Sequence, residues 1–454
     1  MNTFLVGFAK QNVNPPLGIG ISGYYVPRFA KGILDDIDVR VLALSKNEKK
    51  ILLISVPVCG VHDTFLACAY KKIRQKTNVK EDSIFISATH THTGPLINPV
   101  PIFFEADETT INIYAEFLAE RLADTAKLAL DDLKPAKMGF ATGRAPERVA
   151  YIRRYKMKDG STYTCPPIND PNIDYPIGSL DQRVHILRFD RQDTPSIVFV
   201  NYGLHTDTIG GELISPDWPG WMYSTIEKAL DGTQCIFFNG SEGDVGSTHV
   251  FPDGGDMNDT EISFDNEMKS PGMARFIGRA IAGTVLQVYD KVHYIEVDKI
   301  NMIKKHISIP ANVPDKKDLP LAHKYAELHN AGREDEIPFK AMQLTTVVAE
   351  ALRMCRLENG PSKFNLCLTG VQIGNVALLG IPGEPFTDIG VGIKETKGWS
   401  MIMPCALTNG DAGYFPMKSA YDEGGYEART SQYKSGVAEK IIVNAKALLE
   451  ELMK

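Results

Sequence analysis

The sequence predicts an α/β protein, with one large mixed β-sheet or two sheets flanked by helices. Short apolar runs typical of strands recur along the chain, and helical patterns lie between several of them. The strand-like runs are residues 2–9, 38–45, 51–58, 83–89, 183–189, 196–203, 234–239, 364–380 and 400–407. The clearest helical stretches have apolar residues at spacings of three and four, and they are residues 110–133, 272–289, 340–356 and 434–452.

Three further features describe the organisation of the chain. A hairpin is predicted where Gly374-Asn375 lies between two apolar runs, and its second strand leads to Gly383-Glu384. The glycine-rich segments 156–180 and 250–270 have weak periodicity, so we expect surface loops beside the site. The charged segment 313–337 is expected to be a helical excursion with a solvated face. We find no internal repeat or linker, which favours a single domain over residues 1–454.

The composition limits the classes of partner. The 454 residues are 43% hydrophobic and 23% charged, and the net charge of -7 argues against nucleic acid or an anionic lipid surface as the main partner. No run approaches the roughly 18 apolar residues that would span a bilayer. We read no signal peptide and see seven scattered cysteines, so we expect a cytoplasmic protein with reduced thiols, or a secreted one if a leader was removed. The sequence leaves the oligomeric state open.

The first candidate site is Thr-His-Thr-His at residues 89–92, where a strand-like run ends in a Gly-Pro turn. Side chains alternate along a strand, so His90 and His92 are expected on one face. That spacing suits two ligands of one zinc, or one ligand and one neighbour. A polar strand end with its histidines hydrogen-bonded in a turn is the alternative.

Two more strand ends carry possible ligands. His205 follows an apolar run, and Glu384 follows another, with Pro385 suited to the first position of a helix. Sites in open α/β sheets assemble at strand ends, and two histidines with a glutamate form a known catalytic zinc pattern that leaves a position for water. Alone, His205 would be a structural histidine and Glu384 a carboxylate favoured at a helix start.

Two other segments are less informative by themselves. Tyr414 closes the segment 408–414 that follows a fourth apolar run, but a phenol with a pKa near 10 is an unusual ligand, so the residues alone indicate a loop aromatic. Ser241 lies in a glycine-rich loop that is neither a G-x-S-x-G elbow nor a phosphate-binding loop. Tight backbone packing there is favoured over a nucleophilic serine.

Taken together, these segments resemble the catalytic domain of the neutral (non-lysosomal) ceramidases, which are zinc-dependent amidohydrolases. The matching pieces appear in the order of that family: 6–10 (VGFAK), 15–18 (PPLG), 89–95 (THTHTGP), His205, Gly243-Asp244, 382–384 (PGE), 409–414 (NGDAGY) and Tyr426-Glu427. They span residues 4 to about 430. The immunoglobulin-like C-terminal domain of that family is not expected here, since one helix follows the last motif.

The resemblance implies a set of site residues. The ligands of one zinc ion would be His90, His205, Glu384 and Tyr414. His92, Arg153 and Tyr426 would be catalytic, with Arg154 as the alternative to Arg153. Ser241 and Asp244 would contact the substrate, although Gly240 occupies the place of a serine that the family has before Gly-Asp. The general base stays open among Asp207, Glu242 and Asp244.

The activity implied by the resemblance is hydrolysis of a linear amide in an N-acyl compound by metal-activated water, as in sphingolipid metabolism. Two alternatives remain. One is a zinc hydrolase of the same fold that acts on a small polar acylated substrate, such as a sugar or amino compound. The other is a ligand-binding homologue without activity. A long apolar cleft beside the zinc would favour a lipid, and a short polar one would favour a small substrate.

Overall fold

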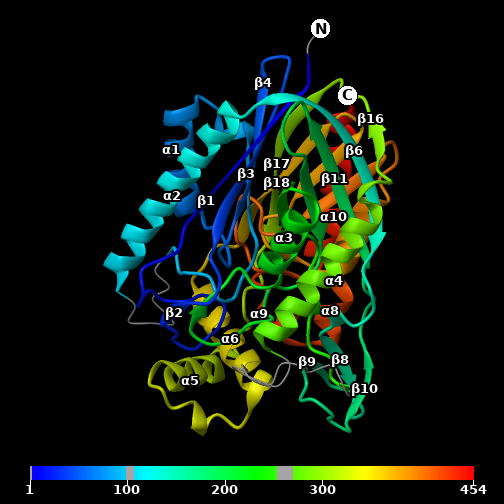
Figure 1. Ribbon diagram of the computed structural model, residues 1–454. Coiled ribbons are helices and arrows are strands. Elements are labelled where there is room, and N and C mark those ends of the chain that lie inside the picture. The colour runs from blue at the N-terminus through cyan, green and yellow to red at the C-terminus, as the bar shows by residue number, and fades with distance from the viewer. Residues whose placement is uncertain (1–2, 99–106, 253–268) are drawn as a thin grey trace.

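Two β-sheets packed face to face form the centre of the protein, in a computed structural model that describes residues 3–98, 107–252 and 269–454 (Figure 1). The larger sheet has nine strands in the order β14-β12-β11-β6-β1-β3-β4-β5, with β16 paired to β6. These strands are β1 (Leu5–Asn12), β3 (Asp38–Lys46), β4 (Lys49–Val56), β5 (Ile84–Ala88), β6 (Lys134–Arg144), β11 (Arg183–Arg191), β12 (Ile197–Tyr202), β14 (Gln234–Asn239) and β16 (His293–Ile295). The sheet is mixed, because β4 runs parallel to β5 and β12 parallel to β14 while the other pairs on that path are antiparallel.

The smaller sheet has four strands in the order β17-β18-β19-β21. Its strands are β17 (Ile300–Pro310), β18 (Lys363–Ile373), β19 (Val376–Gly380) and β21 (Met401–Cys405). The predicted hairpin joins β18 to β19, and Gly374 at its turn has a φ of 57°, which favours glycine. The prediction of two sheets flanked by helices is therefore confirmed.

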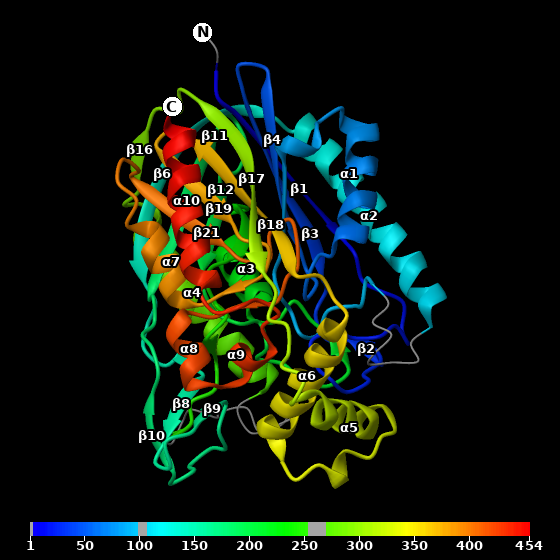
Figure 2. The same cartoon turned by 180° about the vertical axis from the view of Figure 1, so that it is seen from behind.

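Both faces of the larger sheet are apolar, because successive side chains of a strand point to opposite faces and both sets are apolar. Ile51 and Leu53 of β4 pack between the two sheets, while Leu52 and Ile54 point to the opposite face. There they meet α1 (Asp63–Thr77) and α2 (Glu108–Asp131). Along the same face, α3 (Trp218–Ala229) and α4 (Pro271–Tyr289) cover β11, β12 and β14. The outer face of the smaller sheet packs on α7 (Thr387–Lys394) and α10 (Val437–Met453), as Figure 2 shows.

The remaining elements are short, apart from two helices, and many lie beyond the strand ends. Figures 1 and 2 place α5 (Leu319–Asn330) and α6 (Ala341–Glu358) at the end of the sandwich opposite the two termini. The short elements are β2 (Gly32–Ile33), β7 (Tyr151–Ile152), β8 (Arg154–Met157), β9 (Thr162–Thr164), β10 (Ile173–Pro176), β13 (Leu213–Ile214), β15 (Val245–Gly246), β20 (Glu384–Pro385), β22 (Tyr414–Phe415), α8 (Lys418–Glu423), α9 (Tyr426–Thr430), η1 (Glu81–Ser83) and η2 (Glu334–Glu336).

Several local predictions need correction. Segment 156–180 is not only loop, because β8, β9 and β10 form a three-stranded sheet there. Most of segment 250–270 lies outside the described residues. Glu384 does not start a helix: it forms β20 with Pro385, and the next helix begins at Thr387. Segment 313–337 contains helix α5, as expected. Among the described residues, no helix has the length and apolarity needed to cross a membrane.

Candidate metal centre and active site

Three strand ends of the two sheets bring His90, His205 and Glu384 together. His90 lies two residues beyond β5, His205 three beyond β12, and Glu384 four beyond β19. The prediction that His90 and His92 share a strand face is wrong, because β5 ends at Ala88 and His90 has a φ of 70°. The backbone N–H of His90 instead donates to Val58 O over 3.0 Å, so hydrogen bonding to the chain after β4 fixes this turn.

The functional atoms of the three side chains converge on one point. His90 Nε2 lies 3.1 Å from His205 Nε2, and Glu384 Oε2 lies 3.3 Å from each of these nitrogens. All three residues are buried. They form one of two groups of described residues whose ligand atoms are close enough together to hold a metal ion; the other is Cys59, His90 and His92.

The outer nitrogen of each imidazole bonds to a backbone carbonyl. His90 Nδ1 lies 2.7 Å from Cys59 O, and His205 Nδ1 lies 3.1 Å from Glu242 O. A carbonyl can only accept, so both Nδ1 atoms carry a proton, and in the neutral form of each ring Nε2 has a lone pair. Bonds of this kind orient histidine ligands in metalloproteins. Two lone pairs facing each other beside a carboxylate repel unless a cation lies between them, so these residues fit a zinc ion.

The electrostatics also favour positive charge beside Glu384. Burial raises the pKa of Glu384, but His90 and His205 outweigh it and hold this pKa well below its usual range. Burial opposes the charged form of His90, yet Cys59 and Glu384 raise its pKa well above the usual value. Burial and the Arg153 guanidinium lower the pKa of His205 to about 4. A cation at this point would satisfy the carboxylate without requiring a second proton on either ring.

Strand pairing places Tyr414 next to Glu384. β20 and β22 are parallel, with Glu384 opposite Tyr414, and Glu384 N–H donates to Gly413 O over 2.9 Å. Tyr414, Glu384 and His90 line one cavity. Burial raises the pKa of the Tyr414 phenol well above its usual value despite the nearby Arg153. Its ring packs edge-on against Tyr426, with centroids 5.6 Å apart.

His92 lies next to the cluster and faces the cavity. Its Nε2 is 3.2 Å from His90 Nε2, and the two rings meet edge-on. Its other nitrogen points away from the cluster, toward Asp207, whose nearest oxygen is 3.6 Å from His92 Nδ1. The tandem histidines thus have different surroundings.

Arg153 points toward the cluster of His90, His205 and Glu384, and Arg154 points away from it. Arg153 Nη1 lies 3.2 Å from His205 Nε2, and its Nη2 donates to Gly243 O over 2.8 Å. Arg154 turns to the other side, where its Nη2 donates to Glu423 over 2.9 Å. Glu427 holds Arg153 from behind by accepting a hydrogen bond from its Nε.

A cavity of about 470 Å³ opens on this cluster. Such a volume is within the range of small-molecule sites. Tyr426 forms part of its wall, and the hydroxyls of Tyr426 and Tyr25 lie 3.2 Å apart. Tyr25 comes from a loop between β1 and β2, and no sequence pattern indicated it.

Ser241 and Asp244 contact other parts of the fold. Asp244 Oδ1 accepts hydrogen bonds from the Thr387 backbone N–H and hydroxyl over 2.7 and 2.8 Å, which ties it to the start of α7. Burial raises its pKa to about 6. The Ser241 hydroxyl lies against Gly390 of the same helix, where a Cβ would approach it closely. Neither residue is among those that line the cavity.

Glu242 occupies an unusual position behind the cluster. It is completely buried, and neither carboxyl oxygen has a hydrogen-bond partner among the described residues. Burial raises its pKa well above the usual value, which favours the neutral acid. Like Arg153 and His205, it is not among the residues that line the cavity.

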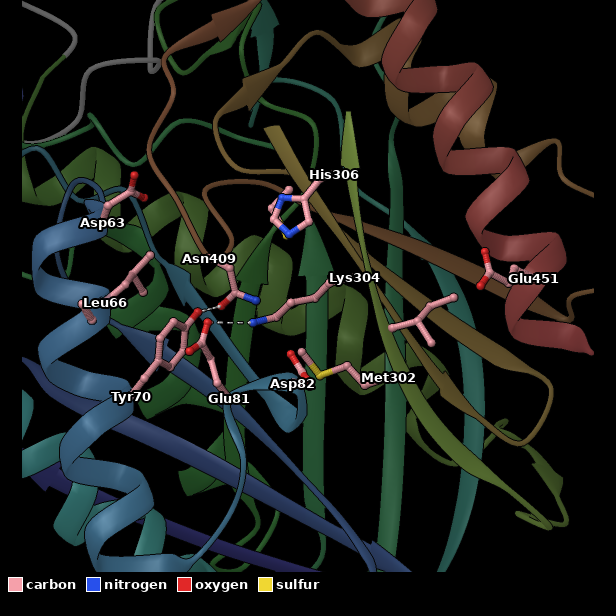
Figure 3. A pocket seen from close by; sticks show the side chains of 13 residues that line it. Asp63, Leu66, Tyr70, Glu81, Asp82, Met302, Lys304, His306, Asn409 and Glu451 are labelled. Atoms are coloured by element: carbon pink, nitrogen blue, oxygen red, sulfur yellow. Dashed lines mark hydrogen bonds and ion pairs between the residues drawn. The ribbon is translucent and has the colours of Figure 1, made fainter. Parts of the chain in front are cut away.

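A larger cavity, of about 750 Å³, lies elsewhere, between α1 and β17 (Figure 3). Lys304 Nζ lies 3.4 Å from Glu81 there, and the Tyr70 hydroxyl donates to Asn409 Oδ1 over 2.9 Å. Asn409, part of a motif noted above, also accepts from Ile86 N–H, so it joins the loop before Tyr414 to β5. Within the described ranges, neither possible metal-binding group includes a residue of this cavity.

The class defined by these features is an α/β protein of two packed sheets with a candidate metal centre at the strand ends. No protein-family model matches the sequence, and no curated protein matches it either. The structure is similar to the neutral ceramidase from Pseudomonas aeruginosa, with a TM-score of 0.71 and 16% identity over 99% of this chain and 75% of that one. A ceramidase complexed with C2 is similar at a TM-score of 0.72 and 15% identity, over 99% of this chain and 76% of that one. The chain therefore has a neutral ceramidase-like fold, as its motifs predicted.

Proposed function

We propose that this protein is a zinc-dependent hydrolase that cleaves the amide bond of an N-acyl compound. The observation that carries the proposal is the convergence of His90, His205 and Glu384 within 3.3 Å, beside a cavity that His90 and Glu384 line. His90, His205, Glu384 and Tyr414 would hold one zinc ion per chain. The motifs resemble those of a family of amidohydrolases, and the similarity in fold to two solved structures named as ceramidases supports the choice of an amide.

Zinc bound at this point would acidify a water molecule and polarise the carbonyl of the amide. The protein's own residues supply the rest. Arg153 presents a fixed guanidinium beside His205, where it can donate to a carbonyl oxygen that gains negative charge. His92 faces the cavity beside His90, within reach of a bound amide. Tyr426 and Tyr25 form a hydroxyl pair on the wall that can orient the substrate.

A compact polar substrate is the second candidate, because the cavity lining carries charged side chains beside apolar ones. The mouth carries His62 and Asp411, 3.5 Å apart, and Arg356, which contacts Gln432. Apolar and aromatic side chains, such as Leu96, Ile97 and Tyr25, share the lining with these polar groups. A short acyl group on a polar amine or sugar would match this mixture of surfaces.

Metal analysis together with a substrate panel tests the proposal. Protein purified without chelators should contain about one zinc per chain, and N-acyl compounds of graded chain length should be hydrolysed with release of free amine. The zinc part would be overturned by wild-type protein that binds no transition metal. A preference for short acyl chains would support the polar substrate, and a preference for long chains would support the lipid. Zinc without hydrolysis of any panel member would contradict the amidase proposal and support a binding protein.

A further inference from the structure

Arg356 is the one arginine or lysine among the described residues that line the cavity beside the candidate metal centre. It lies in the last turn of α6 and is exposed. Within the described ranges its guanidinium has no ion-pair partner, and the hydrogen bond from its Nη2 to Gln432 Oε1 is long, at 3.5 Å. The charge of Arg356 is therefore available to a ligand in the cavity.

The Gln432 amide orients the guanidinium without neutralising it. Gln432 Nε2 donates to Ala412 O over 3.1 Å and to the Tyr433 hydroxyl over 2.9 Å. Both amide hydrogens are in use, so Oε1 is left to face Arg356. An amide oxygen carries no net charge, so this contact leaves Arg356 without a counter-ion.

Two neighbouring arginines add positive charge on this side of the mouth. Arg353, one turn earlier in α6, is buried and donates to two backbone carbonyls, Arg429 O over 2.9 Å and Asn312 O over 2.8 Å. Burial lowers the pKa of Arg353, and the charges of Arg356 and Arg429 lower it further. Arg429 forms an ion pair with Glu350. Among the described residues, the three guanidinium groups thus have one carboxylate in ion-pair contact.

The two carboxylates in the described lining of the cavity have other contacts. Glu384 belongs to the candidate metal group. Asp411 Oδ2 lies 3.5 Å from His62 Nε2. Neither forms an ion pair with Arg356, so a ligand would meet an uncompensated guanidinium at the mouth.

Tyr25 shows that the metal group and Arg356 are close to the same part of the lining. Burial raises the pKa of the Tyr25 phenol, and Glu384 raises it further, whereas Tyr426 and Arg356 lower it. Both charges therefore act on one side chain of the cavity wall. In a cavity of about 470 Å³, one small molecule can reach the metal group and Arg356 together.

We propose that Arg356 binds a carboxylate of the substrate, so that the substrates are N-acyl compounds that carry an acid group in addition to the amide. A guanidinium presents two parallel N–H donors that match a carboxylate. The assignment rests on the proposed function, since only an amide at the metal group makes this carboxylate part of a substrate. A cation in the last turn of a helix also stabilises the helix dipole, but that role does not require a place in the cavity lining.

Paired substrates test the proposal on zinc-loaded full-length protein. One series consists of N-acetylated amino acids with increasing separation of amide and acid, from N-acetylglycine to N-acetyl-ε-aminocaproate. The other consists of N-methyl monoamides of dicarboxylic acids, which carry the acid on the acyl half. Each acid is compared with its neutral carboxamide of nearly the same shape. We expect kcat/KM for the best acid to exceed that for its carboxamide by about 10- to 100-fold, because hydrogen bonds between charged groups are the stronger ones.

Variants of Arg356 assign this preference to the residue. Arg356→Gln should reduce the acid-to-carboxamide ratio to about 1, and Arg356→Lys should retain part of it, since lysine keeps the charge but not the fork. Added salt should lower the ratio in wild type and not in Arg356→Gln, because an exposed charge is screened. Arg74→Gln is the matched control: Arg74 is an exposed arginine in the last turn of α1, and its loss should leave the ratio unchanged.

The outcomes separate this proposal from the proposed function. Hydrolysis with no preference for any acid over its carboxamide would overturn the carboxylate site and leave the hydrolase standing, and this comparison needs no variant. An unchanged ratio in folded Arg356→Gln would also overturn it. If no compound is hydrolysed, the proposed function fails, and calorimetric binding of the same pairs decides the site. Tighter binding of an acid that is lost in Arg356→Gln would support it, and equal binding of acid and carboxamide would overturn it.

Discussion

Glu427 accepts a 2.7 Å hydrogen bond from Nε of Arg153, and Glu427 is completely buried. Its second oxygen accepts from the Thr164 hydroxyl over 2.7 Å. Two donors hold this buried carboxylate in place. Because it binds Nε of Arg153, the two Nη atoms of the guanidinium point toward His205 and Gly243 O. Glu427, which the sequence indicated only as part of a motif, therefore sets the position of the Arg153 guanidinium.

Arg153→Lys should lower kcat by about 10²- to 10³-fold, in the range found when one donor to a developing oxyanion is removed. Lysine keeps the charge but loses the fork that reaches His205, Gly243 O and Glu427 together. Arg154→Lys, one residue away, is the matched control and should keep most of the activity. Steady-state kinetics on the best amide of the panel measure both. Equal losses in the two variants would contradict the assignment of Arg153.

Metal content distinguishes the proposed zinc ligands from their neighbour His92. His205→Ala and Glu384→Ala should each abolish stoichiometric zinc, because each removes an atom from the converging set. His92→Ala should retain zinc and lose activity. Zinc per chain after dialysis, measured by plasma mass spectrometry, distinguishes these results. His306→Ala, an exposed histidine of the second cavity, controls for adventitious metal. Loss of zinc from His92→Ala would instead favour the group that includes Cys59.

Much of the fold could be predicted because most strands are apolar on both faces. Runs such as 51–56 and 234–239 are buried between helices and a second sheet, so their apolar residues are nearly continuous. β6 and β17 were missed, since both carry lysines and exposed positions that hide the pattern. Helix α1 was missed for a similar reason: four of its residues are buried, in a largely polar segment.

The site was predictable in part, for a different reason. The ligand set came from motifs, and the structure does bring His90, His205 and Glu384 together. Their convergence depends on the order of strands in two sheets, which spacing along the chain does not reveal. The choice between Arg153 and Arg154 depends on which face of the chain meets the cluster, because neighbouring side chains point to opposite sides. Contacts of Asp207 with Tyr24 and Lys269 join three separate loops, and no local pattern indicates them.

Gly243 offers a test of how closely the backbone packs behind Glu384. A Cβ on Gly243 would lie 2.6 Å from Glu384 O, and the Gly243 N–H donates to Pro385 O over 2.9 Å. Gly243→Ala should therefore displace β20, weaken zinc binding and lower the free energy of unfolding by about 1–3 kcal/mol. Zinc competition with a chelator and urea unfolding measure the two effects.

Gly283→Ala is the matched control for Gly243→Ala. Gly283 lies inside α4, and an added Cβ there would meet no atom within 4 Å. Alanine is favoured over glycine in a helix, so this variant should gain up to about 1 kcal/mol of stability and keep its zinc. Identical zinc affinities in the two variants would show that β20 tolerates the side chain.

The burial of His185 lets us predict how the free energy of unfolding depends on pH. It lies on β11, is 5% exposed, and its Nδ1 is 2.9 Å from the Thr142 hydroxyl. Burial, followed by the charge of Lys394, holds its pKa well below the usual value, so the native state keeps this ring neutral. The unfolded chain binds a proton there below about pH 6.5. The contribution of His185 to the free energy of unfolding is therefore complete above that pH. It is lost as the pH falls toward the pKa of His185 in the native state.

Urea unfolding at pH 7, 6 and 5 measures this effect by comparison with a His185→Gln variant. One such group changes the free energy of unfolding by at most about 1.4 kcal/mol per pH unit. The wild type should lose stability between pH 6.5 and 5 more steeply than the variant, by up to that slope. Other histidines contribute equally to both proteins, so the difference between the two profiles isolates His185. Parallel profiles would mean that His185 is protonated in the native state or has the same pKa in both states.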